Sequence, residues 1–284
     1  MKTIRMKNIW LLLRDSAIAW DKDNIAQQGA ALSFFIVFSL SPLLILVIVL
    51  SGFGFGQEAA SGHLVSQIRG QIGIEGASFV QSLISNARKS GFSVRTAIFS
   101  VVMILMGVSA VFIQLRDSLN SIWHIRQKPA GTILSFFRVR LHSFAVILGI
   151  GLLLLVSLII SAVLAAMSDH VSSLLNFIVS FAGITVVFAL LFEFFPDAII
   201  KWRDVWVGAA VTSLFFSIGK LVLGWYLDNG DIGSTFGAAS SLVIFMLWAY
   251  YSSQIVLFGA EFTRLYAIRF GSNILPGENA IRVA

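Results

Sequence analysis

The residues best suited to chemistry in this chain lie in two long apolar stretches in its last third. Lys220 stands in the first stretch, together with Ser213 and Ser217. Spacings of four and three residues place the three side chains on one face of a helix. An ammonium costs about 2.5–3.5 kcal/mol at the centre of a bilayer, so a lysine in such a helix is a candidate for binding an anionic group. The alternative is a structural ion pair with an outer-side carboxylate, from Asp169, Asp228 or Asp231.

The second stretch contains polar groups that would extend this path. Tyr250 and Gln254 are one helical turn apart, and Glu261 lies near the end of the same stretch. The hydroxyl and the amide can hydrogen-bond a polar solute, whereas Glu261 is expected at the inner membrane boundary. We expect either a polar route from Lys220 inward past Tyr250 and Gln254, or a sealed ion pair on the outer side. The other inner-side candidates are Arg116, Asn120 and Glu193.

Groups for catalysis or metal binding do not converge in the sequence. The four histidines are far apart and show no metal-ligand spacing, at His63, His124, His142 and His170. The chain has neither a Gly-x-Ser-x-Gly nucleophile motif nor a phosphate-binding loop, and it has no cysteine. We therefore expect no enzymatic activity, no cofactor and no metal. A membrane-embedded hydrolase or nuclease is the least favoured hypothesis.

The composition indicates the elements that must position these residues. Of the 284 residues, 57% are hydrophobic and 12% are charged, whereas soluble domains have about 25% charged residues. Six apolar runs are each long enough to cross a hydrocarbon core about 30 Å thick. We predict a single-domain, all-α polytopic membrane protein with six transmembrane helices, at about residues 31–55, 95–115, 142–167, 171–193, 205–227 and 237–261.

The remaining segments are expected to flank this bundle. Residues 1–23 place apolar side chains at helical spacing, which predicts a cytoplasmic amphipathic leader. Residues 57–94 are too polar to span, and their apolar spacing predicts two short amphipathic helices on the outer side. Residues 262–284 are predicted to form a cytoplasmic tail. Pro42 bends the first span, either as a hinge for gating or as a static kink.

The distribution of basic residues predicts the orientation. The net charge is +6, and 15 of the 20 Lys and Arg residues fall on one side of a six-helix arrangement. Cytoplasmic loops are enriched in Lys and Arg, so both termini are predicted to be cytoplasmic. This topology explains the basic bias better than a nucleic-acid partner does.

Four segments resemble the YihY/BrkB family of bacterial inner-membrane proteins. They are GAALSFFIVFSLSPLLILV, LRDSLNSIWHI, GKLVLGWYLDNG and FGAASSLVIFMLWAYYSSQIVLFGAEFTRLYA. The resemblance covers essentially the whole chain and implies six spans and an inner-membrane location. The family's motifs are expected at Pro42, Asn120, Lys220, Tyr226, Gly237, Trp248, Tyr250 and Glu261. One departure is LFEFFPD, where the family resembles Tyr-Arg-x-x-Pro-Asn and Glu193 replaces a basic residue.

The resemblance also implies a range of functions. Members have been labelled ribonuclease BN, a misassignment that agrees with the missing nuclease residues. Others have been linked to serum resistance, to export of organic solutes and to movement of a lipid A precursor. We expect a transporter or flippase-like protein for an organic solute or an anionic lipid, passive or driven by an ion gradient because no nucleotide-binding motif is present. The alternative is a non-transporting scaffold that binds membrane lipids or envelope partners.

Overall fold

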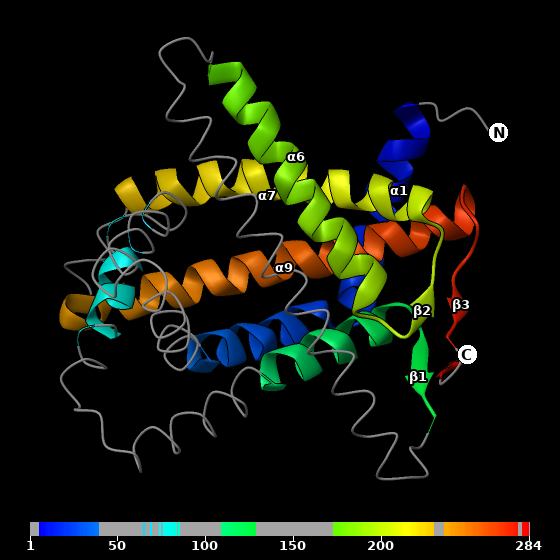
Figure 1. Ribbon diagram of the computed structural model, residues 1–284, viewed down its shortest axis with the longest axis horizontal. Helices are drawn as coiled ribbons and strands as arrows, with labels where there is room; N and C mark the ends of the chain where they lie inside the picture. Colours follow the sequence, from blue (N-terminus) through cyan, green and yellow to red (C-terminus); the bar gives the residue numbers. More distant parts are fainter. Residues whose placement is uncertain are drawn as a thin grey trace, which may run out of the picture. The chain divides into compact units, whose positions relative to one another are not determined.

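Helices make up most of the described structure, as the sequence predicts. The computed structural model describes residues 6–39, 65, 69, 74, 76–83, 85, 109–128, 173–229, 236–277 and 280–283. The labelled helices of Figure 1 are α1 (Met6–Lys22), α6 (Ser173–Phe194), α7 (Trp202–Asn229) and α9 (Ser240–Arg269), and the 3-10 helix η1 (Gly237–Ala239) precedes α9. Further helical segments are Ile25–Ser39, 76–83 and 109–122.

Two of the described helices are long and apolar enough to cross a membrane. They are Trp202–Leu227 within α7 and Ser240–Arg269, while Ile25–Ser39 and Ser180–Phe194 are shorter apolar helices. The prediction of six spans stays a prediction, because the predicted span at 142–167 and parts of others lie outside the described residues. Pro42, Asp169, Asp231 and the side chain of Asp228 also lie outside the described residues, so what the sequence predicts for them stays a prediction.

Four short strands modify the all-α prediction. Strand β1 (Ile125–Gln127) pairs antiparallel with β4 (Ala280–Arg282), and β2 (Ala198–Ile199) pairs antiparallel with β3 (Leu275–Pro276). With two or three residues each, they are too short to show a period of two in the sequence. Their consequence is long-range: they tie the C-terminal segment to the chain that follows helix 109–122 and helix α6.

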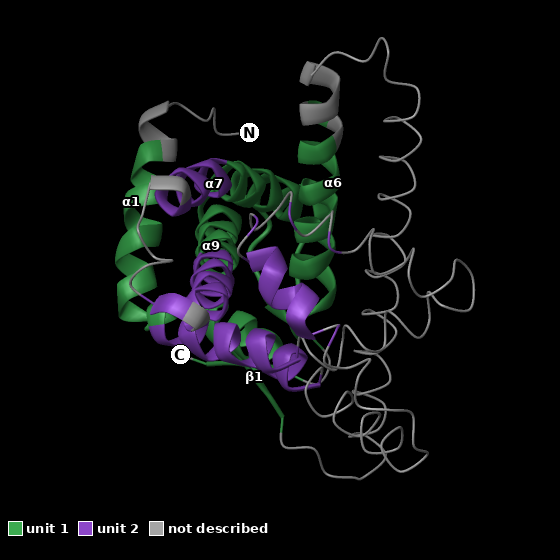
Figure 2. Cartoon of the chain, turned by 90° about the vertical axis from the view of Figure 1, so that its left-hand side faces the viewer, with its two compact units in different colours: residues 1–26, 115–217, 255–284 green, residues 27–114, 218–254 purple. Residues whose placement is uncertain are grey.

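The chain divides into two compact units, shown in Figure 2. Unit 1 comprises Met1–Ala26, Leu115–Ser217 and Ile255–Ala284. Unit 2 comprises Gln27–Gln114 and Ile218–Gln254. Each unit has its own apolar cluster, so each is described by itself.

In unit 1, the predicted N-terminal amphipathic segment is the helix α1. Leu12 is buried and packs with Phe262 and Tyr266 of α9, and Val207 and Val211 of α7 border this cluster. The opposite side of α1 exposes large apolar side chains, among them Trp10 and Ile18. A helix with apolar groups on both sides can bind the protein with one face and a membrane surface with the other, which is the contact that the amphipathic pattern predicts.

Helices α7 and α9 approach closely in unit 1 through a reciprocal pair of glycine and threonine contacts. A Cβ atom added at Gly208 would lie 1.9 Å from Thr263 Oγ1, and one added at Gly259 would lie 2.0 Å from Thr212 Oγ1. Each threonine hydroxyl donates to the carbonyl of the glycine four residues earlier in its own helix, at 2.8 Å for Thr212 and 2.7 Å for Thr263. Small residues of this kind let membrane helices pack with their backbones close together.

Unit 2 has a smaller core on the first half of α9. Val80 and Phe245 are buried there, bordered by Ile36 from helix Ile25–Ser39 and by Trp248. Val80 belongs to the segment for which the sequence predicts amphipathic helices, and 76–83 is helical. Its apolar face therefore covers protein side chains in this part of the segment.

The Gly259 contact predicts a stability effect. Replacing Gly259 with valine should lower the free energy of unfolding by about 1–3 kcal/mol, the usual cost of overpacking, because the new side chain meets Thr212. The measurement is thermal unfolding of the detergent-purified protein. Gly224→Ala is the matched control, since nothing lies within 4 Å of a Cβ atom there. An equal unfolding temperature for Gly259→Val and wild type would contradict the packing described.

Candidate functional site

Asp197 is the centre of the first polar cluster of unit 1. It follows Pro196 directly at the end of α6, and its carboxylate forms an ion pair with Arg116 that includes an Nε to Oδ2 bond of 3.0 Å. Asn120, one turn after Arg116, donates from Nδ2 to Asp197 Oδ2 at 2.8 Å. It also accepts from the Asp197 backbone N–H at 2.8 Å. Gln127 of β1 adds a bond of 2.8 Å to the same carboxylate.

The Asp197 cluster is electrostatically satisfied. Burial raises the pKa of the Asp197 carboxyl, but hydrogen bonds from Arg116, Gln127 and Asn120 with the Arg116 charge outweigh it and hold this pKa below its ordinary value. The pKa of the neighbouring Asp117 is raised. Burial is the main cause; the Arg116 charge acts against it, and the Asp197 charge adds to it. Asp197 therefore stays ionised and joins helix 109–122, α6 and β1.

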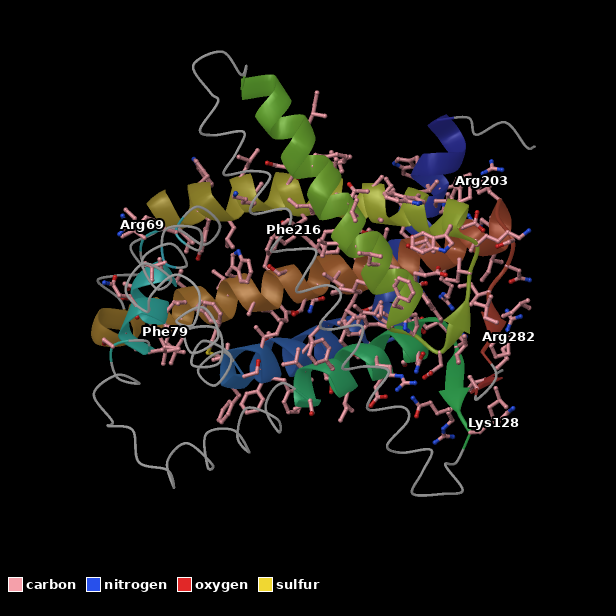
Figure 3. The ribbon with its side chains drawn as sticks, viewed as in Figure 1. Arg69, Phe79, Lys128, Arg203, Phe216 and Arg282 are labelled. Atoms are coloured by element: carbon pink, nitrogen blue, oxygen red, sulfur yellow. The ribbon has the colours of Figure 1, made fainter. Side chains whose placement is uncertain are left out.

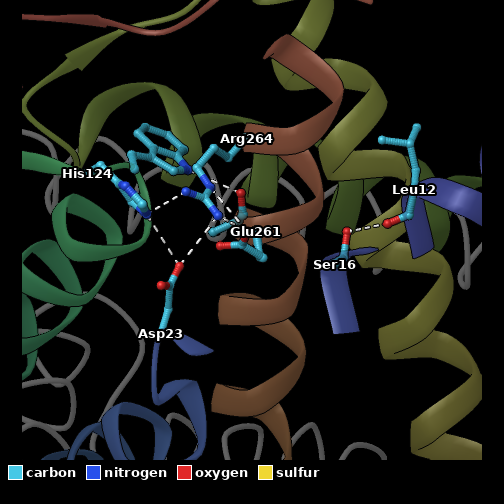
Figure 4. A network of polar contacts seen from close by, with 8 residues as sticks. Leu12, Ser16, Asp23, His124, Glu261 and Arg264 are labelled. Atoms are coloured by element: carbon cyan, nitrogen blue, oxygen red, sulfur yellow. Dashed lines mark hydrogen bonds and ion pairs between the residues drawn. The ribbon is translucent and has the colours of Figure 1, made fainter. Parts of the chain in front are cut away.

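Arg264 is the centre of the second polar cluster, shown in Figure 4. Its guanidinium donates from Nε to Glu261 Oε1 at 3.1 Å and forms an ion pair with the same carboxylate. The same Nη2 that faces Glu261 lies 3.4 Å from Asp23 Oδ2, and Nη1 contacts His124 Nε2. His124 Nε2 also lies 3.5 Å from Asp23 Oδ2. Arg264 thus links α9 to the residues that follow α1 and helix 109–122.

Backbone geometry fixes two of these partners. His124 has a φ of 55° and Asn24, next to Asp23, has a φ of 52°, so both turns use the left-handed region. Trp123 is buried and donates from Nε1 to the carbonyl of Ala260 at 3.1 Å. The indole therefore anchors the His124 turn to α9, one residue before Glu261.

An open recess of about 590 Å³ lies beside both clusters. Polar side chains dominate its lining, and Asn120, His124 and Gln127 also belong to the clusters just described. The other lining residues are Asp117, Ser121, Ile125, Arg126 and Val283. Because His124 reaches both the recess and the Arg264 cluster, solvent at the recess has a titratable neighbour that touches buried charges.

The predicted inner-side residues are all in unit 1, and the structure brings two of them together. Arg116 and Asn120 meet on Asp197. Asn120 is buried, so it is part of the packed interior. Glu261 belongs to the other cluster, and Glu193 joins neither: its Oε2 is buried and has no hydrogen-bond partner among the residues described.

The predicted path residues divide between the units. Ser213 and Ser217 of unit 1 each donate to the carbonyl four residues earlier, at 2.9 and 2.8 Å. In unit 2, Tyr250 is exposed, while Gln254 lies against Gly29, where an added Cβ atom would be 2.2 Å from its Nε2.

Five residues of the two clusters are not among the site residues predicted from the sequence: Asp197, Arg264, Asp23, His124 and Gln127. A signal was present for two of them: Asp197 follows the proline that ends α6, and Arg264 stands three residues after Glu261, at ion-pair spacing on a helix. Asp23 and His124 had no such signal, because about a hundred residues separate them in the chain.

Removal of the Asp197 charge should destabilise the protein. Asp197→Asn leaves Arg116 without its anion in a half-buried place, and we expect a loss of about 2–3 kcal/mol in the free energy of unfolding, between exposed and fully buried pairs. Chemical unfolding in detergent measures it. The control is Asp15→Asn, which breaks the more exposed pair with Arg269 and should cost much less. Equal losses for the two variants would contradict this role.

The same carboxyl predicts a pH dependence. Its folded-state pKa lies below the ordinary value of 3.8, so its stabilisation is complete above the unfolded-state pKa and is lost as pH falls through the folded-state pKa. The stability difference between wild type and Asp197→Asn should be constant near neutral pH and shrink in acid. Unfolding curves at a series of pH values test this. A difference that persists unchanged in strong acid would contradict the assignment.

Comparison with known proteins identifies the family. The family model described as Virulence factor BrkB matches residues 18–281. A UPF0761 membrane protein of Ralstonia nicotianae is 29% identical, over 84% of this chain and 55% of its own length. One from Neisseria meningitidis serogroup B is 26% identical, over 89% of this chain and 62% of its own length. The chain thus spans somewhat more than half the length of these relatives.

No solved structure matches the chain. The family match extends over nearly all described elements, from α1 to β4, and both relatives are named as membrane proteins. This agrees with the two described helices of membrane-crossing length and with the resemblance found in the sequence. The chain belongs to the Virulence factor BrkB family and is similar to the UPF0761 membrane proteins.

Proposed function

We propose that this protein moves an anionic organic solute or an anionic lipid across the bacterial inner membrane, without catalysing a chemical reaction and without a cofactor. Transport is passive or driven by an ion gradient. The protein belongs to a membrane family. Its described helices α7 and α9 are apolar and long enough to span a membrane.

Lys220 is the observation that supports transport most directly. It is the only charged residue between Val205 and Leu227 of α7, and its side chain is half-buried. Its neighbours Leu221 and Val222 are exposed, as expected of side chains that face lipid. Charged groups inside spanning helices face the bundle or a polar cavity and mark substrate or ion pathways. Lys220 would attract the anionic group of the solute or lipid.

A hydroxyl group accompanies Lys220 in unit 2. An added Cβ atom at Gly219 would lie 1.0 Å from Tyr251 Oη, so the Tyr251 phenol rests on the α7 backbone next to Lys220. Tyr251 packs against α7 at this point, whereas Tyr250, the tyrosine predicted on the route, is exposed. A phenol hydroxyl can accept from an ammonium or donate to an anion.

The orientation of the protein in the membrane is also part of the proposal. Basic side chains of unit 1, including Lys128, Arg203 and Arg282, lie at its strand-bearing end in the view of Figure 3. Lys and Arg concentrate on the cytoplasmic side of inner-membrane proteins, so we place this end and both termini in the cytoplasm.

These basic side chains also favour the second candidate function. Exposed Lys and Arg residues at a membrane surface attract anionic lipid headgroups. A protein that uses them only for lipid or partner binding would be a scaffold. Lys220 would then form a structural pair with an outer-side aspartate.

Substitution of Lys220 distinguishes the two functions. The assay uses proteoliposomes of phosphatidylethanolamine and phosphatidylglycerol, with fluorescent NBD-phosphatidylglycerol as the lipid probe and radiolabelled glutamate as the soluble anion. We expect wild type to move at least one probe faster than empty vesicles. Lys220→Met should lower that rate about tenfold or more, because removal of a charge interaction of about 1.4 kcal/mol has this effect.

Lys220→Arg is the matched control, since it keeps the positive charge and should retain most of the flux. Equal flux in wild type and Lys220→Met would contradict the role of Lys220. If wild type moves neither probe yet binds anionic vesicles, the scaffold function is favoured and the transport proposal fails.

A further inference from the structure

We propose that Glu261 is a proton-binding site, reached from the recess through His124 and Asp23, and that its protonation drives transport. The first part stands on the geometry of unit 1 alone. The second part rests on the proposed transport function, for which it names the proton as the driving ion.

Glu261 is set up to take a proton. Its side chain is 0% exposed, inside a helix of membrane-crossing length. Oε1 accepts from Arg264, but Oε2 is buried and has no hydrogen-bond partner in the described part of the chain. A buried, ionised carboxylate oxygen without a donor is costly, and the neutral carboxylic acid costs less at the same place because the charge is removed. Proton uptake at Oε2 would remove this cost.

The charge balance of the Arg264 cluster favours uptake of one proton. Among the described residues, the charged or titratable groups in direct contact with Arg264 are Glu261, Asp23 and His124. Two carboxylates share one guanidinium, so protonation of Glu261 leaves Arg264 with one carboxylate for its one positive charge. A low-dielectric surrounding makes an unbalanced charge expensive, and a single added proton balances it.

The route to Glu261 begins at the recess. His124 lines the recess with a side chain that is 39% exposed, and its Nε2 lies 3.5 Å from Asp23 Oδ2. Asp23 Oδ2 and Glu261 Oε1 share Arg264 Nη2 as a neighbour, so the two carboxylates are close. The Arg264 guanidinium, which is a donor only, holds the two carboxylates together.

The proton steps balance at each group. His124 takes a proton on Nε2 from water in the recess, which replaces the bond that Nε2 accepts from Arg264 Nη1, and becomes an imidazolium. It gives this proton to the Asp23 carboxylate and returns to the neutral imidazole. The Asp23 carboxylic acid then gives the proton to Glu261, and Asp23 is again a carboxylate.

Protonation of Glu261 has a structural consequence. While Glu261 is ionised, Arg264 binds a carboxylate of its own helix as well as Asp23 and His124. Once Glu261 is neutral, the charge of Arg264 is balanced by Asp23 alone. The pull between α9 and the segment after α1 then strengthens, while the local bond within α9 weakens. A proton gradient can thereby change how α9 is held.

Infrared difference spectroscopy tests the proton site directly. Wild-type protein in vesicles is compared between alkaline and acidic buffer, and the carboxylic-acid C=O band that appears on acidification is recorded. We expect Glu261→Gln to lose part of this band. Asp15→Asn is the matched control and should keep the band, because it removes a carboxylate that Arg14 and Arg269 hold ionised near the surface and leaves the Arg264 cluster intact. Glu261→Asp should restore a band with a shifted midpoint, which excludes misfolding as the cause.

Transport with an imposed pH gradient tests the coupling. The gradient should change the wild-type flux of NBD-phosphatidylglycerol or glutamate several-fold and leave the flux of Glu261→Gln unchanged. Identical infrared bands in wild type and Glu261→Gln would overturn the proton site. A flux that is insensitive to the gradient would overturn the coupling. If wild type moves neither probe, the transport function and its coupling fail together, while the infrared band still decides whether Glu261 binds a proton.

Discussion

The structure depends on one constraint: a buried charged side chain needs a partner that balances its charge or hydrogen-bonds to it. Only 12% of the residues are charged, and an ionised group without a partner in apolar surroundings costs several kcal/mol. Unit 1 meets this constraint with one central partner in each cluster: Arg264 faces two carboxylates, and Asp197 accepts from a guanidinium and two amides. Each cluster joins elements that are far apart in sequence, so the charges also determine which segments meet.

Residues 120–127 connect the two clusters. Asn120 and Gln127 bind Asp197, and between them Trp123 and His124 contact α9. Strand β1 then pairs with β4, which brings the C-terminal segment to the same place. This arrangement explains why a polar recess lies beside buried ionic groups in a protein of such low charge. It also means that a change in the charge of Glu261 reaches α9, α1 and helix 109–122 through a few bonds.

Structural features that depend on the spacing of neighbouring residues could be predicted from the sequence. Helical periodicity identified α1, and apolar length identified α7 and α9, since both depend on neighbouring residues. Arg116 and Asn120 were predicted as inner-side candidates because they continue the helix of a predicted span. Their partner Asp197 was not, because it lies about eighty residues away. Asp23 had no histidine near it in sequence, yet the fold brings His124 to it. Long-range pairing, including the four short strands, comes from the packing of the whole unit.

Proton movement within the protein is the central claim of this account, and capacitive current on a solid-supported membrane measures it most directly. Proteoliposomes are adsorbed on the sensor and exposed to a step in pH, without any solute, so that charge displaced inside the protein appears as a transient current. The account predicts a transient for wild type that exceeds that of empty liposomes and of Glu261→Gln. A wild-type transient no larger than that of empty liposomes would contradict it.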